Sequence, residues 1–444
     1  MSVSKTTLLL NGLLVTIDEN YRIFQGDILI ENGRISQLGH VDKKKADIVI
    51  DCSNLIILPG FIQTHTHLCQ TLFRGQADDL QLLPWLQQKI WPMEASHDTA
   101  TMRISARLGI AEMLKSGTTT IQDMGSVHHY DEIFDEAKQT GIRINGGKCM
   151  MDFAETVPDY LLEDCTSSLQ ETERLIKTWH NTENNRLRYS MAPRFAVSCT
   201  TKLLAESAAM ARHYGCNLHT HASENQDEIA LIEKRENSRN IDFLHKYGFT
   251  GEDTTLVHCV WLNEHEKATL QHTHTSVAHC PASNMKLASG FAPIIDLLQR
   301  DVNVTLGTDG APCNNNHDML LEMRLAALIH KPAHGADAIT AKDVVHMATI
   351  AGAKALNLEK EIGTLEVGKK ADIIGLRASA LHSVPADDVY SQIVYSMSGH
   401  DVQLTMVDGE ILMLDRELKT IDEEATLAAV QPALRDVVSR SSTL

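Results

Sequence analysis

The first 58 residues alternate short apolar stretches with polar turns, which is the pattern of a small β-domain. Four stretches are expected to form strands, at 8–17, 26–31, 34–38 and 48–52. Short apolar runs bounded by turn residues are typical of strands. In the first stretch Asn11-Gly12 separates two apolar runs, and this dipeptide favours a two-residue turn. We therefore predict a hairpin at that point.

From Pro59 onward the pattern changes to short apolar segments that end in polar residues and are separated by helical stretches. Eight such segments occur, at 61–67, 118–123, 142–148, 187–194, 217–221, 255–258, 276–279 and 303–309. Strands that alternate with helices form βαβ units and a parallel sheet, and eight units close into a barrel. The predicted fold class is therefore α/β, a TIM-like (β/α)8 barrel.

After residue 358 the chain returns to β character, chiefly at 363–376, 402–407 and 410–413. Because the two β-rich regions flank the barrel in sequence, we expect them to combine into one small composite β-sandwich. The predicted domains are residues 1–58 and 359–414 for the sandwich, 59–358 for the barrel and 415–444 for a helical tail. Pro432 interrupts the tail, where a proline removes one helical hydrogen bond and predicts a break.

The composition narrows the range of partners. The 444 residues include 40 Lys and Arg against 58 Asp and Glu, a formal charge of −18, and no basic cluster builds a positive face. Such a surface repels polyanions, so nucleic acid is not expected as a partner. No apolar run approaches the roughly 18 residues of a membrane span, so no membrane partner is expected either. Nine cysteines without CxxC pairs indicate a reducing compartment, and we predict a cytoplasmic protein.

The first chemical signal is the pair His65 and His67, at the end of the first barrel segment. Residues i and i+2 of a strand share a face, so both imidazoles point the same way where barrel active sites form. Two neutral imidazoles suit a borderline ion such as zinc. The pair alone is weak evidence, because the chain has 22 histidines and His272-Thr-His274 repeats the spacing.

Four later segment ends carry the same residue types and strengthen that signal. The residues are His219, His221 and Glu224 at the fifth segment, His258 at the sixth, His279 at the seventh and Asp309 at the eighth. These side chains are rarely buried without a partner, so their recurrence points to a site. Three imidazoles and one carboxylate would hold Zn²⁺ and leave a position for water. Since His221 lies nearer the strand end than His219, we choose His221 as the ligand and expect His219 to fill a layer inside the barrel.

Several of these stretches resemble a known family. The run 59–95 is similar to the amidohydrolase-superfamily deaminases of modified adenosines, which act on 5′-deoxyadenosine, 5′-methylthioadenosine or S-adenosylhomocysteine. The motifs at 221–224, 279–290 and 307–316 carry the same resemblance, which covers nearly the whole chain. Residues 146–152 and 192–199 are most similar to 5′-deoxyadenosine deaminases.

The resemblance implies a barrel with a β-sandwich, one zinc or iron ion per subunit, a homo-oligomer (dimer or tetramer), and hydrolytic deamination of an adenosine derivative to the inosine analogue and ammonia. It also implies roles for individual residues. They are His65, His67, His221 and Asp309 as metal ligands; Glu224 as proton shuttle; His258 with Asp309 beside the attacking oxygen; Glu94 at the ribose hydroxyls; and Gln70, Arg194 and His279 along the base pocket.

Arg194 is the main departure from that family, since many of its members have histidine after the preceding proline. The Pro-Arg-Phe form also resembles guanine deaminases, so guanine or 8-oxoguanine deamination stays an alternative, although Glu94 favours a nucleoside. Hydrolytic dechlorination of an s-triazine is a further reaction of similar enzymes. A non-catalytic binding barrel is the second alternative, and the intact ligand set together with Glu224 argues against it.

Overall fold

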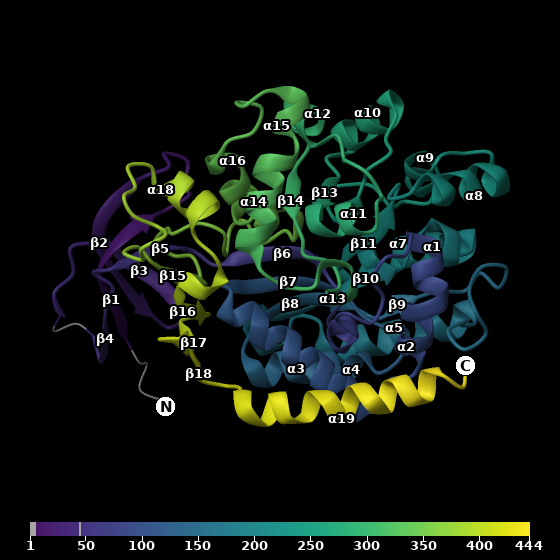
Figure 1. The fold of residues 1–444 in the computed structure, drawn as a ribbon, viewed down its shortest axis with the longest axis horizontal. Coiled ribbons are helices and arrows are strands. Elements are labelled where there is room, and N and C mark those ends of the chain that lie inside the picture. The colour runs from purple at the N-terminus through teal and green to yellow at the C-terminus, as the bar shows by residue number, and fades with distance from the viewer. Residues whose placement is uncertain (1–5, 44–45) are drawn as a thin grey trace.

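A barrel of parallel strands forms the centre of the protein in the computed structural model, which describes residues 6–43 and 46–444 (Figure 1). Its eight main strands are β6 (Phe61–Thr66), β7 (Thr118–Met124), β8 (Arg143–Gly147), β10 (Leu187–Pro193), β11 (Asn217–Ala222), β12 (Thr254–His258), β13 (Ser276–His279) and β14 (Val304–Leu306). The short strand β9 (Cys149–Met150) pairs with β10. Each main strand overlaps one predicted segment, so the predicted (β/α)8 barrel is confirmed.

The first and last barrel strands meet through contacts that also place a site residue. The Asp309 amide donates to the His65 carbonyl at 3.1 Å, and the hydroxyls of Thr64 and Thr305 lie 2.6 Å apart. Asp309 therefore follows β14 directly beside the carboxyl end of β6.

Helices surround the barrel and cover its ends. In chain order they are η2 (Leu68–Phe73), α1 (Leu82–Trp85), η3 (Leu86–Ile90), α2 (Trp91–Ala95), α3 (Thr99–Lys115), α4 (Tyr130–Thr140), α5 (Cys165–Trp179), α6 (Thr182–Asn185), η4 (Ala196–Ser198), α7 (Thr201–Tyr214), α8 (Gln226–Glu236), α9 (Asn240–Lys246), α10 (Glu264–Thr273), α11 (Pro281–Lys286), α12 (Ile294–Gln299), α13 (Ala311–Asn314), α14 (Met319–Ile329), α15 (Lys331–His334), α16 (Ala341–Met347), α17 (Ile350–Ala355), α18 (Val389–Ser391), η5 (Gln392–Ser396), η6 (Gly399–Asp401) and α19 (Glu423–Ser441). Several begin at capping residues whose side chains accept a backbone hydrogen bond, among them Asp98, Asp164, Thr200 and Asn263. Within the described ranges, no helix has the length and apolar character needed to cross a bilayer.

Strands from both ends of the chain build a second sheet, at the left of Figure 1. The N-terminal strands are β1 (Thr7–Val15), β2 (Ile23–Glu31), β3 (Arg34–Gly39), β4 (Ile48–Asp51) and β5 (Leu55–Pro59), and the C-terminal strands are β15 (Ile373–Arg377), β16 (Val402–Val407), β17 (Glu410–Leu414) and β18 (Glu417–Leu418). The two sets join where β5 pairs antiparallel with β15. Strand β5 was not predicted, because its apolar run continues into β6. We propose residues 1–58 and 359–414 as the sandwich, 59–358 as the barrel and 415–444 as the helical tail.

The hairpin predicted at Asn11-Gly12 is wrong. Strand β1 runs straight through this dipeptide and pairs with β2 on both sides of it, with a shift of register between Leu9 and Gly12. Asn11 is in the left-handed region (φ 59°), and its amide donates to Asp27 Oδ1 at 2.8 Å. A Cβ at Gly12 would lie 2.6 Å from the Ile57 side chain. The dipeptide therefore forms a β-bulge rather than a turn.

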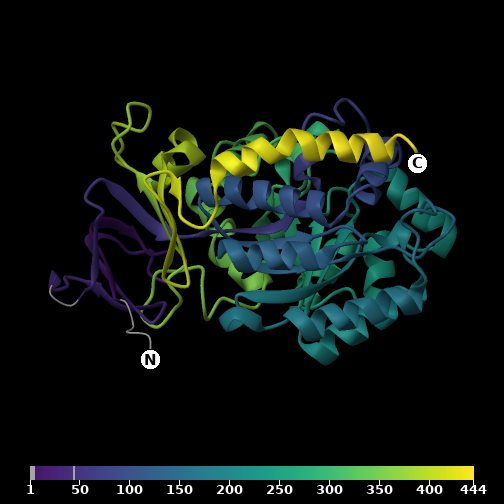
Figure 2. The ribbon, with the colours of Figure 1, turned by 90° about the horizontal axis from the view of Figure 1, so that it is seen from below.

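The break predicted at Pro432 is also wrong, because α19 continues through it. Ala433 and Val437 are buried against the barrel, and packing of this face outweighs the loss of one hydrogen bond. The helix lies along α3, as Figure 2 shows, and is fixed at its two ends by Lys115–Glu423 and Arg440–Asp98 ion pairs.

A buried ion network joins the floor of the barrel, the amino-terminal end of its strands, to the second sheet. Arg143, the first residue of β8, donates from Nε and Nη2 to the two Asp372 oxygens at 2.8 and 2.9 Å. Its Nη2 also donates to Asp408 Oδ1 at 2.8 Å, and Lys370 Nζ donates to the same oxygen at 2.8 Å. Arg143 and Asp372 are almost completely buried, so this network ties the sheet to the barrel.

Candidate metal centre and active site

Four polar side chains converge at the mouth of the barrel, where the strands have their carboxyl ends. His65 comes from β6, His67 directly follows that strand, His221 comes from β11 and Asp309 from the turn after β14. One potential ligand atom of each lies within 4.8 Å of all the others. Asp309 Oδ1 is 3.2 Å from His65 Nε2 and 3.4 Å from His67 Nε2. The structure thus brings together the four residues that the sequence proposed as metal ligands.

Backbone carbonyls fix the orientation of two of these imidazoles. His67 Nδ1 donates to the Met124 carbonyl at 2.7 Å, and His221 Nδ1 donates to the Arg194 carbonyl at 2.6 Å. Because a carbonyl only accepts, Nδ1 carries the proton in both rings, and each neutral ring has a lone pair on Nε2. These two Nε2 atoms are 3.3 Å apart.

The chemistry of this donor set fits a divalent cation. Two lone pairs that face each other at 3.3 Å repel unless a positive charge lies between them, and His65 Nε2 is buried without a hydrogen-bond partner among the described residues. Burial lowers the pKa of all three histidines, so their neutral, metal-binding form prevails at neutral pH. Three imidazole nitrogens and one carboxylate oxygen suit zinc.

His219 was expected only to fill a layer inside the barrel, but in the structure it also contacts a proposed ligand. It is fully buried on β11, and its Nε2 lies 3.0 Å from His65 Nδ1, within hydrogen-bond distance. A hydrogen bond to the far nitrogen of a ligand histidine sets its tautomer and orientation. No sequence signal distinguishes this contact from ordinary packing.

Glu224 and His258 lie beside the cluster. Glu224 Oε2 is 3.5 Å from His258 Nε2, and the same nitrogen is 3.9 Å from Asp309 Oδ2. Burial raises the pKa of the Glu224 carboxyl, although His258 partly counteracts this effect. A carboxyl group whose pKa is raised toward neutrality can both accept and release a proton. The three residues predicted to carry out the chemistry are therefore neighbours.

Glu94 lies in a buried ion pair that sequence reasoning did not foresee. Arg194 donates from Nη1 to Glu94 Oε2 at 2.7 Å and from Nη2 to Oε1 at 3.1 Å, and Gln70 Nε2 donates to Oε1 at 2.7 Å. The structure thus joins three of the four residues predicted to bind substrate. Their individual roles stay predictions.

The fourth, His279, is fully buried, and neither ring nitrogen has a hydrogen-bond partner among the described residues. Its ring centre is 5.5 Å from that of His330. Of the four residues predicted to bind substrate, Arg194 lines the cavity at the barrel mouth, whereas Glu94, Gln70 and His279 do not. Their predicted contacts with a substrate stay predictions.

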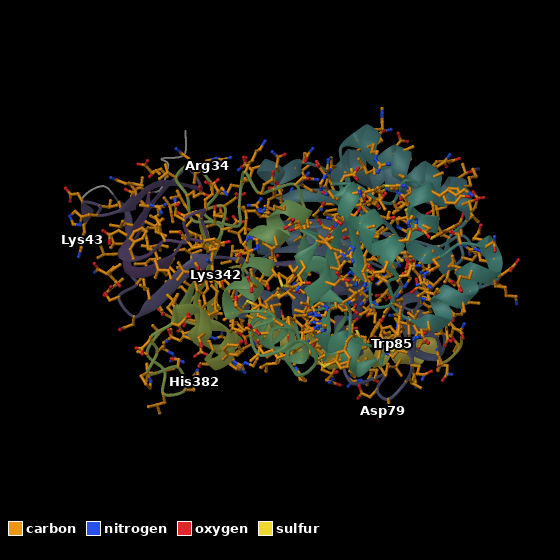
Figure 3. All side chains as sticks on the ribbon, turned by 90° about the horizontal axis from the view of Figure 1, so that it is seen from above. Arg34, Lys43, Asp79, Trp85, Lys342 and His382 are labelled. Atoms are coloured by element: carbon orange, nitrogen blue, oxygen red, sulfur yellow. The ribbon has the colours of Figure 1, made fainter. Side chains whose placement is uncertain are left out.

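A cavity opens onto the cluster. Its lining includes polar residues (His67, His221, Glu224, His258, Asp309 and Arg194) and apolar residues (Leu82, Trp85, Leu86, Phe195 and Leu287). Trp85 ends α1 in the segment that follows β6, and Figure 3 places it on the barrel side of the molecule, away from Arg34 on the sheet side. Its buried indole N–H has no partner among the described residues.

A barrel whose mouth gathers histidines, an aspartate and a buried glutamate is typical of a class of metal-dependent hydrolases. Residues 56–412 match the amidohydrolase family, and this chain belongs to it.

The relatives agree with each other in chemistry. The chain is 37% identical over 432 residues to 5′-deoxyadenosine deaminase of Methanosarcina mazei, covering 97% of this chain and 98% of the relative. It is 40% identical over 413 residues to 5-methylthioadenosine/S-adenosylhomocysteine deaminase of Thermococcus onnurineus, covering 93% and 95%. The crystal structure of an adenosine deaminase from Xanthomonas campestris with bound zinc superposes with a TM-score of 0.91 at 30% identity and covers 98% of both chains.

Proposed function

We propose that this protein hydrolytically deaminates an adenosine derivative and releases the inosine analogue and ammonia. The observation that carries this proposal is the placement of Glu224 and His258 directly beside the four-residue cluster, where both line the same cavity as the cluster. The deaminase chemistry of the relatives over almost their full length supports it.

The four residues of the cluster would hold one Zn²⁺ or Fe²⁺ per subunit. When bound, such an ion supplies a nucleophile at neutral pH, because it lowers the pKa of water from 15.7 to about 7. We propose His65, His67, His221 and Asp309 as its ligands.

Glu224 would move the protons. Addition of water to C6 requires a base for one proton of the water and an acid for N1 of the purine. A carboxyl with a raised pKa can take the first proton and deliver it to N1, and it can then assist the departure of ammonia as the C6–N bond breaks. His258 lies beside the attacking oxygen and would hold it while C6 becomes tetrahedral.

Glu94 and Arg194 would together bind the ribose. A carboxylate offers about four acceptor positions, and Arg194 and Gln70 already occupy three of those on Glu94. One remains for a ribose hydroxyl, while Arg194, which lines the cavity, has further N–H groups to donate. We propose that Glu94 accepts a hydrogen bond from one ribose hydroxyl and that Arg194 donates a hydrogen bond to the other.

The apolar residues that line the cavity favour an uncharged 5′ substituent. With C6 placed at the cluster, the 5′ end of a nucleoside would lie among apolar lining residues such as Leu82, Leu86 and Leu287. Burying a charged group without a partner is costly. We therefore propose 5′-deoxyadenosine or 5′-methylthioadenosine as better substrates than S-adenosylhomocysteine.

A substrate panel on zinc-loaded enzyme tests this function. We expect 5′-deoxyadenosine and 5′-methylthioadenosine to release ammonia with kcat/KM values about 10-fold above that of S-adenosylhomocysteine, with adenosine between them. Methylthioadenosine and S-adenosylhomocysteine share the thioether, so their ratio isolates the charged amino-acid group. Turnover of guanine alone would contradict the nucleoside assignment.

Guanine deamination stays the second candidate, because Arg194 lines the cavity and could address a purine carbonyl. The Glu94→Gln variant separates the two functions. We expect the ratio of kcat/KM for 5′-deoxyadenosine to that for free adenine to fall at least about 10-fold, since only the nucleoside has ribose hydroxyls. The ratio cancels any effect on the base transmitted through Arg194. An unchanged ratio would favour a free-base enzyme.

We also propose a cytoplasmic location and a homo-oligomer. All nine cysteines are free thiols and eight of them are buried, which suits a reducing compartment. The oligomer follows from the family resemblance alone.

A further inference from the structure

The segment Ser283–Ser289, which follows β13 and contains the end of α11, contacts three functional residues with three different side chains. The contacts are Ser283 Oγ to Asp309 Oδ2 at 2.6 Å, Asn284 Oδ1 to His258 Nδ1 at 2.8 Å, and Ser289 Oγ to Glu224 Oε1 at 2.9 Å. The sequence motif at 279–290 carries the family resemblance, but none of these three residues was assigned a role.

We propose that Ser283, Asn284 and Ser289 are positioning residues, each of which fixes the orientation of one group that acts in the reaction. This inference rests on the proposed deaminase function. All three residues are at most 2% exposed, so water does not compete for their hydrogen bonds. Partners of this kind hold acting groups in productive geometry.

Ser289 selects which oxygen of Glu224 faces the reaction. Its hydroxyl donates to Oε1, and the other oxygen, Oε2, lies toward His258 at 3.5 Å. A hydrogen bond to an ionised carboxylate is short and strong, and it holds the side chain in one rotamer. Without it, Glu224 could rotate away from the proton that it must accept.

Asn284 selects the tautomer of His258. Its Oδ1 only accepts, so His258 Nδ1 carries the proton and a neutral ring has its lone pair on Nε2. That nitrogen is the one near Glu224 and Asp309. The opposite tautomer would present a proton to both carboxylates and could not accept one.

Ser283 engages one oxygen of Asp309, and the other oxygen faces the cluster. The hydroxyl donates to Oδ2, whereas Oδ1 lies near His65 and His67 and also accepts the Gly310 amide at 2.7 Å. Ser283 and the Gly310 amide therefore orient the carboxylate so that Oδ1 faces these two imidazoles.

The segment itself is held firmly from outside. The Ser289 carbonyl accepts a hydrogen bond from Trp261 Nε1 at 2.7 Å. Gly290 has φ +125°, and a Cβ there would lie 3.0 Å from Val260 and 3.1 Å from Trp261. Leu287, in the same segment, lines the cavity. The part of the chain that orients the acting groups thus also contacts the substrate space.

The first test compares steady-state kinetics of alanine and conservative variants with 5′-deoxyadenosine. We expect S289A and N284A to lower kcat about 10-fold to 100-fold with KM within about 3-fold, because they misplace acting groups without removing substrate contacts. S289T keeps the hydroxyl and N284D keeps the acceptor, so both should recover most of kcat. S207A is the matched control. Among the described residues, the hydroxyl of this buried serine on α7 contacts only Met150 Sδ, at 3.9 Å, and kcat should not change.

The second test measures zinc affinity of the metal-free protein by competition with a chromophoric chelator, which requires no turnover. We expect S283A to weaken zinc binding about 10-fold to 100-fold, as removal of such partners typically does. S289A and N284A should stay within about 3-fold of the wild type, since neither residue contacts a proposed ligand.

The outcomes separate this inference from the proposed function. If S289A and N284A keep kcat within 2-fold, or if S289T and N284D lose as much as the alanine variants, the positioning role is overturned. A drop in thermal midpoint that accounts for the lost activity would also overturn it. If the wild type deaminates no adenosine derivative, the proposed function fails, and S283A still decides the role of Ser283 through zinc affinity.

Discussion

The mouth and the floor of the barrel are both deeply buried and both rich in ionisable groups, but their charges are arranged in opposite ways. At the floor, Arg143 lies between Asp372 and Asp408, and Lys370 also pairs with Asp408. At the mouth, three neutral imidazoles surround one carboxylate, and two ring nitrogens with lone pairs face each other at 3.3 Å.

The difference shows how burial alone does not identify a functional site. The floor satisfies each buried charge with an opposite charge from the same chain, so it is complete and serves to join the sheet to the barrel. The mouth brings together nitrogen and oxygen atoms with free lone pairs, but no cationic side chain of the cluster lies between them. Strained or unsatisfied polar groups are typical of functional sites, where local rules are broken for chemistry. Substitutions should therefore cost activity at the mouth and stability at the floor.

The largest effect is expected for E224Q at the mouth. The amide cannot accept the proton from water, so kcat for ammonia release should fall about 100-fold to 10,000-fold. The free energy of unfolding should not decrease, because a neutral amide is cheaper to bury than a carboxylate. A kcat within 10-fold of the wild type would show that another group shuttles the proton.

The floor should respond in the opposite way. R143A leaves the carboxylates of Asp372 and Asp408 buried with less compensation, and breaking such a pair costs about 3–5 kcal/mol in the free energy of unfolding. Denaturant unfolding measures this loss, while kcat/KM of the folded enzyme should stay within about 3-fold. R174A is the matched control, because its ion pairs with Asp131 and Glu171 are exposed and should contribute less than about 1 kcal/mol.

The smallest effect concerns the pH dependence of activity. Glu224 must be ionised to accept a proton, and burial raises its pKa above the ordinary 4.5. Thus kcat/KM should fall as pH decreases through a value above 4.5. The Ser289 hydrogen bond favours the ionised form, so S289A should move this acidic limb to higher pH. The measurement is kcat/KM of both proteins over pH 4–9. An acidic limb at the same pH in S289A and the wild type would show that Ser289 does not affect the titration of Glu224.

The sequence was sufficient for the barrel and for the residues that meet at its mouth. Alternation along a strand puts His65 and His67 on one face, and parallel strands bring their carboxyl ends to one edge, so His221 and Asp309 are expected near them. The family resemblance distinguished these two residues from His258 and His279, which also lie at strand ends. The sequence was not sufficient where contacts depend on distant backbone. Asn11-Gly12 has the composition of a turn, but pairing of β1 with β2 on both sides makes it a bulge.

The partners of the site residues were the least predictable part. The ion pair of Arg194 with Glu94 joins residues 100 positions apart, and its geometry depends on how the fold brings two buried side chains together. The contact of His219 with His65 likewise looks like ordinary packing in the sequence. The motif at 279–290 includes Ser283, Asn284 and Ser289. Only the structure shows which functional group each of them contacts.

The central claim is that the barrel mouth is incomplete without one divalent cation. Anomalous scattering from a crystal of the zinc-loaded protein, measured at the zinc absorption edge, tests it most directly. We predict one strong peak per chain, about 2.0–2.2 Å from Nε2 of His65, His67 and His221 and from Asp309 Oδ1. A fully loaded crystal with no peak at these four atoms, or with the ion held elsewhere, would contradict the account.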